Sequence, residues 1–142
     1  MFSMSAKRIL VTGPMADAPY DQLGTWAFDG EEAYTVTPLT ALRKDYEVVY
    51  EPALAYSRDA STAGIPAAVA AARGVDAVVA FVGEEAILSG EAHSLSQINL
   101  QGAQSELIKA LKATGKPVVV VVIAGRNLTI ERDLENCDAM LY

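Results

Sequence analysis

The chain has 142 residues, of which 51% are hydrophobic, and its 11 Lys and Arg against 18 Asp and Glu give a formal charge of −7. This length and apolar content suit one domain with a single core. The negative charge disfavours binding to phosphate backbones and anionic lipids, so neither nucleic acid nor a membrane is an expected partner. The longest apolar run, residues 118–124, is also far shorter than the roughly 20 residues of a membrane-spanning helix.

Several site types are excluded by the sequence. Cys137 is the only cysteine, so an internal disulfide and a Cys-x-x-Cys motif are impossible, and we expect it to be a small buried residue beside a strand. Residues 110–117 lack the first glycine and the Ser/Thr of a phosphate-binding loop, and residues 12–17 lack a dinucleotide fingerprint. We therefore predict no cofactor and no metal. Residues 1–14 lack the apolar core of an export signal.

Apolar runs rich in β-branched residues recur along the chain. Such runs, apolar on both faces, are typical of parallel strands that helices cover. The sequence therefore predicts five strands, at residues 9–11, 48–50, 77–82, 118–123 and 139–142.

Helix signals separate these strands. Thr37 is a good N-cap and precedes Pro38 at the first helical position. A second helix is predicted to begin at Pro66 and run to Arg73, where Gly74 ends it. A third is predicted because four apolar residues recur on one helix face: Ala103, Leu107, Ala110 and Leu111. A weaker helix is expected over residues 128–135.

Alternating strands and helices predict an α/β fold in three layers, with a mostly parallel, doubly wound sheet of about five strands. The outline is flavodoxin-like, and the expected strand order is 2-1-3-4-5. No helix follows the apolar residues 139–142 to cover the sheet there. We therefore expect residues 1–142 to form a single domain that is part of a longer protein.

Two long segments interrupt this alternation: the first long loop, Met15–Val36, and the second long loop, Gly83–Asn99. Both leave the carboxyl end of a predicted strand, where ligands bind in open α/β sheets. The second carries three carboxylates and the only histidine, at Glu84, Glu85, Glu91 and His93, and the first carries Trp26. Trp26 is either a platform for a sugar ring or an aromatic plug beneath the loop.

Several segments together resemble the second domain of glycoside hydrolase family 3. The resemblance covers nearly the whole chain, through residues 11–17, 23–26, 82–92, 107–121 and 125–128. It is carried most clearly by Ser89-Gly90-Glu91-Ala92 and by Gly115-Lys116-Pro117 before the Val-rich strand. Where related sequences have Arg and Asp after the glutamate, this chain has Leu95 and Gln97, which alters the sugar contacts expected of the loop.

The resemblance implies a domain of a retaining β-glycosidase of the β-glucosidase type. A (β/α)8 barrel, absent from this chain, would supply the nucleophilic aspartate, and Glu91 matches the position of the general acid/base. A retaining glycosidase needs two carboxyl groups about 5–5.5 Å apart, so one loop glutamate is inactive alone. A β-linked glycoside and the barrel are the implied partners, and the parent enzyme would be periplasmic or secreted.

The residues leave alternatives open. Glu91 could be a solvated loop carboxylate, and Glu84 could cap or solvate the loop rather than bind substrate. His93 is a second acid/base candidate because imidazole titrates near neutral pH. The whole chain could also be a free-standing flavodoxin-like binding or interaction module without catalysis.

Overall fold

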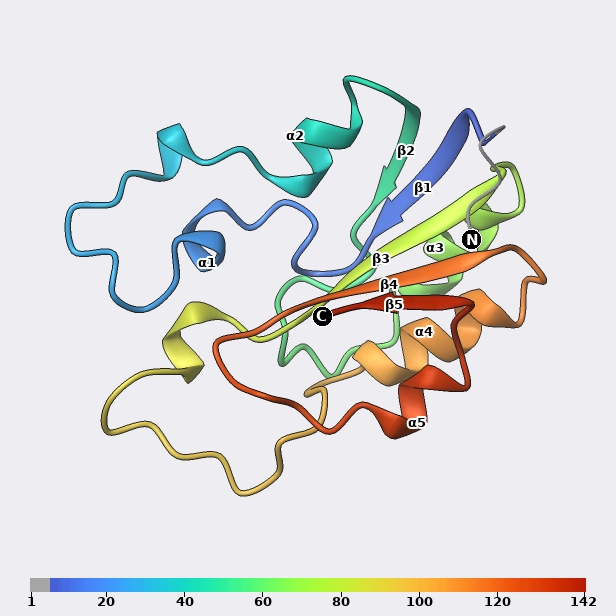
Figure 1. The fold of residues 1–142 in the computed structure, drawn as a ribbon. Helices are drawn as coiled ribbons and strands as arrows, with labels where there is room; N and C mark the ends of the chain where they lie inside the picture. The colour runs from blue at the N-terminus through green and yellow to red at the C-terminus, as the bar shows by residue number, and fades with distance from the viewer. Residues whose placement is uncertain (1–5) are drawn as a thin grey trace.

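The computed structural model describes residues 6–142 and shows five strands in one sheet (Figure 1). The order is β2-β1-β3-β4-β5 and every neighbouring pair is parallel, which confirms the predicted fold class and strand order. The strands are β1 Arg8–Thr12, β2 Glu47–Glu51, β3 Ala77–Gly83, β4 Val118–Ile123 and β5 Ala139–Leu141.

Short helices connect the strands. They are α1 Pro19–Leu23, α2 Pro38–Leu42, α3 Ile65–Ala72, α4 Gln104–Lys112 and α5 Glu131–Leu134, with 3-10 turns η1 Glu32–Tyr34 and η2 Ala86–Leu88. Thr37 caps α2 as predicted, because its hydroxyl accepts the Thr40 N–H at 3.2 Å. The helix expected over residues 128–135 is shorter than predicted, since only Glu131–Leu134 is helical.

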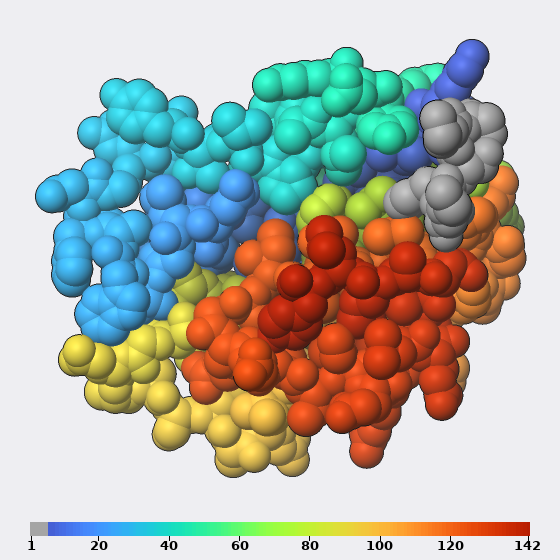
Figure 2. Space-filling model, in the orientation of Figure 1, coloured from blue at the N-terminus to red at the C-terminus, as the bar shows by residue number. Residues whose placement is uncertain are grey.

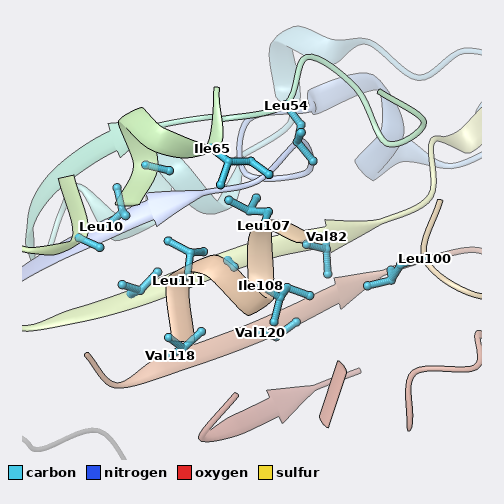
Figure 3. Close-up of a cluster of buried hydrophobic side chains, with 14 of the residues drawn as sticks. Leu10, Leu54, Ile65, Val82, Leu100, Leu107, Ile108, Leu111, Val118 and Val120 are labelled. Carbon is cyan, nitrogen blue, oxygen red and sulfur yellow. The ribbon is translucent and has the colours of Figure 1, made fainter. Parts of the chain in front are cut away.

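Alternation along the strands sends side chains to two cores, one on each face of the sheet. In β3, Val78, Ala80 and Val82 face the core beneath α3 and α4. Leu107, Ile108 and Leu111 of α4 point into this core and are fully buried there (Figure 3). The buried face of α4 therefore contains Ile108, whereas the predicted Ala110 is only half-buried.

The face of the sheet opposite α3 and α4 is covered less completely by helices and loops. Val79 and Phe81 of β3 and Val11 of β1 pack there with Met15 and Leu39, under α2 and the start of the first long loop. A groove of about 720 Å³ remains over the rest of this face, between α2 and the end of β5. Val119 and Val121 of β4 line it and are half-buried, in contrast to their fully buried neighbours on the α4 side.

Two aspartates fix the amino ends of neighbouring strands. The Asp76 carboxylate, just before β3, accepts the N–H groups of Lys7 and Arg8 at 2.8 and 2.9 Å. Asp138, just before β5, accepts the Val118 N–H at 2.8 Å. These hydrogen bonds fix the strand register at the edge opposite the long loops.

Cys137 differs from its expectation. The side chain is half-buried rather than buried, although it does pack against the α4-side core. Burial and the neighbouring Asp138 carboxylate raise the pKa of its thiol, so it is mainly a neutral packing group.

Candidate functional site

The two long loops lie side by side where β1 and β3 end, as the sequence predicts. Figure 2 shows the first loop, blue to cyan, directly against the yellow second loop at one end of the molecule. Thr25 makes the closest polar contacts between them. Its hydroxyl donates to the Ala86 carbonyl at 2.7 Å and lies 2.8 Å from the Ser89 hydroxyl. The Asp21 carboxylate accepts the Ala86 N–H at 2.8 Å, so α1 and η2 are held together.

Gln104 of α4 holds the end of β3. Its amide is fully buried, accepts the Gly83 N–H at 2.8 Å, and donates to the carbonyls of Gly83 and Ser57 at 2.9 and 2.8 Å. Gly83 has φ +140 and lies so close to the Ile123 carbonyl that no Cβ could fit. The backbone therefore turns out of the sheet at Gly83 along one fixed path.

A buried ion pair follows this turn. The Glu84 side chain is 1% exposed, and its Oε2 lies 3.1 Å from Nε of Arg126, which comes from the loop after β4. Arg126 also donates through Nη2 to the Leu88 carbonyl. The other oxygen of Glu84, Oε1, is buried and has no hydrogen-bond partner among residues 6–142. Glu84 is thus engaged inside the protein rather than open to solvent, and the substrate-binding role expected of it stays a prediction.

Glu85 points to the other side of the loop. Its Oε2 accepts the Ser57 hydroxyl at 2.7 Å and pairs with Arg58 at 3.2 Å. Burial alone would raise the pKa of Glu85, but the hydrogen bonds from Arg58 and Ser57 outweigh it and lower the pKa below the ordinary value. Glu85 is therefore a charged anchor for the loop.

Beyond these anchors, the loop becomes exposed at Gly90. Gly90 has φ +102, and a Cβ there would lie 2.7 Å from the Thr25 methyl and 3.6 Å from the Trp26 ring. The ring of Trp26 is 56% exposed and stands 6.1 Å from that of Phe28. The two sequence candidates Glu91 and Trp26 thus flank the same contact between the loops.

Glu91 and His93 are both exposed, two residues apart. Between them, Ala92 has φ +57, a backbone conformation that residues other than glycine rarely adopt. The catalytic role of Glu91 and the binding roles of Trp26 and His93 stay predictions, but the geometry brings all three to the rim formed by the two loops.

Sequence reasoning missed the residues that hold this rim. Thr25 and Arg126 occur in segments that carry the family resemblance, but no local pattern assigns their contacts to residues 64 and 38 positions away. Gln104 did leave a signal, because it is the polar residue on a helix face otherwise occupied by Leu107, Ile108 and Leu111.

Two features are absent from residues 6–142. No helix in this part of the chain is long and apolar enough to cross a membrane. No group of three or more His, Cys, Asp or Glu side chains there is arranged to hold a metal ion.

The fold is a parallel α/β domain whose two long loops meet at the carboxyl ends of β1 and β3. Residues 2–142 match the model of the glycosyl hydrolase family 3 C-terminal domain. The chain belongs to this family.

Relatives of the chain include proteins named as β-glycosidases. The chain is 34% identical to a periplasmic β-glucosidase of Salmonella typhimurium, over 94% of the chain and 20% of the relative. It is 35% identical to a β-xylosidase of Formosa agariphila, over 95% and 20% of the two chains. Among solved structures, the β-glucosidase of Listeria innocua bound to isofagomine superposes with a TM-score of 0.87 and 37% identity, over 95% of this chain and 18% of the enzyme. The chain thus spans about a fifth of the length of these proteins.

Proposed function

We propose that this chain is the domain of a retaining β-glycosidase that supplies the general acid/base, Glu91, and one wall of the active site. The observation that carries the proposal is the position of Glu91. It follows a loop that several partly buried hydrogen bonds hold, yet Glu91 itself is exposed at the rim beside Trp26. A fixed loop with an exposed carboxylate at its tip suits a group that must reach a substrate bound outside this domain.

The chemistry requires a second carboxylate from elsewhere. In a retaining glycosidase one carboxylate attacks the anomeric carbon, and the second carboxyl group protonates the departing oxygen and later deprotonates water. Glu91 fills the second role. A general acid must hold its proton at the working pH, which requires burial or a nearby negative charge. Glu91 is exposed here, so the partner domain and the bound sugar would complete its surroundings.

The partner is a (β/α)8 barrel that precedes this domain in the same polypeptide and supplies the nucleophilic aspartate. The surface of the first long loop supports an interdomain contact there, because its aromatic side chains are unusually exposed for a monomer surface. Phe28 and Tyr34 are 87% and 83% exposed, and Tyr20 and Trp26 are more than half exposed. A barrel docked on this loop would bury these rings and enclose Glu91.

The substrate is a β-linked glycoside. The relatives named above are a β-glucosidase and a β-xylosidase, which share the β-glycosidic bond and differ in the sugar. Trp26 offers an exposed aromatic face for stacking on a sugar ring. His93 would contribute a polar contact. One relative is named as periplasmic, which supports an extracytoplasmic parent enzyme.

The test uses the polypeptide in which this chain follows its barrel, called here the barrel-containing protein. Glu91→Gln should lower kcat/KM for phenyl β-D-glucoside or xyloside by at least about a hundredfold, because general acid catalysis contributes roughly 10²–10⁴. Azide should restore turnover of a 2,4-dinitrophenyl glycoside, since it replaces the base-activated water. The matched control is Glu131→Gln, at an exposed position on α5. Unchanged activity in Glu91→Gln would place the acid/base elsewhere. Hydrolysis by the chain without a barrel would refute the proposal that the barrel supplies the nucleophile and this domain the acid/base.

A further inference from the structure

The anchors of the Glu91 loop differ in where they act. Ser57, Arg58 and Asp21 contact its beginning, at Glu85 and Ala86. Two contacts lie nearer Glu91: Arg126 donates to the Leu88 carbonyl, three residues before it, and Thr25 of the first long loop contacts Ser89, two residues before it. We propose that Arg126, oriented by its ion pair with Glu84, is a positioning residue that sets where the Glu91 carboxyl lies when substrate is bound. This inference rests on the role proposed for Glu91 and goes beyond it.

The guanidinium of Arg126 connects two separate parts of the loop at once. Nε pairs with Glu84 at the start of the loop, and Nη2 donates to Leu88 at the far end of η2. A planar guanidinium presents its donors in a fixed fork, so the position of Glu84 dictates that of the Leu88 carbonyl. A lysine ammonium has no such fork and is a single point charge. The link that Arg126 makes between Glu84 and the Leu88 carbonyl therefore requires arginine, and lysine would not replace it.

Arg126 is itself held in place from two sides. Gly125 lies against the Ser89 side chain so closely that no Cβ could be accommodated. On the other side, the Tyr142 hydroxyl accepts the Leu128 N–H at 2.8 Å and donates to the Arg126 carbonyl. The Arg126 backbone is therefore tied both to the loop it supports and to the residue that follows β5.

The geometry of the Glu84–Arg126 ion pair is not the one expected if it served only to stabilise the fold. Removing a carboxylate from water is costly, and a buried pair offsets this cost only when its remaining hydrogen-bonding atoms are satisfied. Within the part of the chain that the structure describes, Glu84 Oε1 is buried without a hydrogen-bond partner, and the Arg126 side chain remains 23% exposed. Apolar residues of similar volume would stabilise such a site at least as well. What they would not supply is the directed hydrogen bond to Leu88.

The expected consequence concerns acid catalysis specifically. A displacement of about 1 Å in a catalytic group can cost on the order of a hundredfold in rate. A loosened Glu91 would slow the departure of a poor leaving group, such as phenoxide, which needs the proton. It would scarcely affect 2,4-dinitrophenolate, which departs without one. Binding of the sugar should change little, so the KM of the phenyl glycoside, for which the departure of phenoxide is the slow step, should stay near wild type.

The experiment compares variants of the barrel-containing protein on phenyl and 2,4-dinitrophenyl β-D-glycosides. Arg126→Lys keeps the charge opposite Glu84 but loses the fork. The double variant E84Q/R126M removes both charges, so that no unpaired buried charge threatens folding. The matched control is R8K/E47Q, which alters an exposed ion pair of the same 3.1 Å length between the β1 and β2 strand beginnings.

Both test variants should lower kcat/KM for the phenyl glycoside by ten- to a hundredfold with its KM near wild type. They should leave kcat/KM for the dinitrophenyl glycoside, which reports only the departure of dinitrophenolate, nearly unchanged. The control should alter neither substrate. An equal fall on both substrates would mean a loss of folded enzyme only and would overturn the inference, as would wild-type rates on both. If Glu91→Gln itself retains full activity, the proposed function fails first; if Glu91→Gln is inactive and the Arg126 variants are normal, only the positioning role fails.

Discussion

Replacing Gln104 by leucine should destabilise the domain strongly, although leucine is nearly equal in size and more apolar. Gln104 is fully buried and makes four hydrogen bonds: it accepts from the Gly83 N–H, and it donates to the carbonyls of Ser57, Gly83 and Gln101 at 2.8, 2.9 and 3.1 Å. Leucine leaves these backbone groups without that partner. A buried polar group deprived of its partner costs about 1–3 kcal/mol. At the lower end of this range the four groups cost about 4 kcal/mol, and the added apolar surface of leucine returns about 1 kcal/mol, which leaves a loss of about 3 kcal/mol.

Urea unfolding followed by circular dichroism measures this loss. With a slope of about 1.5 kcal/mol per molar urea, a loss of 3 kcal/mol lowers the midpoint by about 2 M. Gln101→Leu is the matched control, because its amide hydrogen-bonds only to the exposed carbonyls of Gln97 and Asn99 at the surface, and its midpoint should move by less than about 0.5 M. Equal midpoints for the two variants would show that the Gln104 hydrogen bonds contribute no net stability, and would refute the reasoning.

Two further predictions concern the ends of the strands. Gly13→Ala should lower the thermal midpoint more than Gly115→Ala. Both residues have positive φ, but a Cβ at Gly13 would meet the Phe81 backbone, whereas no atom of residues 6–142 lies within 4 Å of a Cβ at Gly115. Equal shifts would contradict the close approach at Gly13. Asp138→Asn should flatten the acid limb of stability against pH: the Lys112 ammonium and the Val118 N–H lower the folded-state pKa of Asp138, so the stabilisation is present above the ordinary Asp value of about 3.9 and is lost as the pH falls through the lower folded value. An unchanged slope of unfolding free energy between about pH 5 and 2 would contradict this linkage.

The sequence determined the architecture of this domain because the signals for it are local. Runs such as 118–123 are apolar on both faces, which is typical of parallel strands in an α/β sheet. Thr37 and Pro38 are favoured at the N-cap and the first position of a helix. Because crossover connections between parallel strands are short and right-handed, only a few orders of five parallel strands remain possible. The same locality limited the prediction for residues 128–135, where no strong cap or apolar face fixes the helix length.

For the candidate site, the sequence predicted the location, and the tertiary structure decided most of the contacts. The acidic loop, Trp26 and their shared edge followed from the sequence, because parallel strands deliver their carboxyl ends to one edge. Only the tertiary structure decided that Glu84 is buried against Arg126, that Glu85 is an anchor, and that Thr25 joins the two loops. These contacts join residues 28 to 64 positions apart, and a polar side chain finds such a partner only after the core has packed. Apolar periodicity is a local property that can be read directly from the sequence. The pairing of buried polar groups depends on which distant residues the folded backbone brings together.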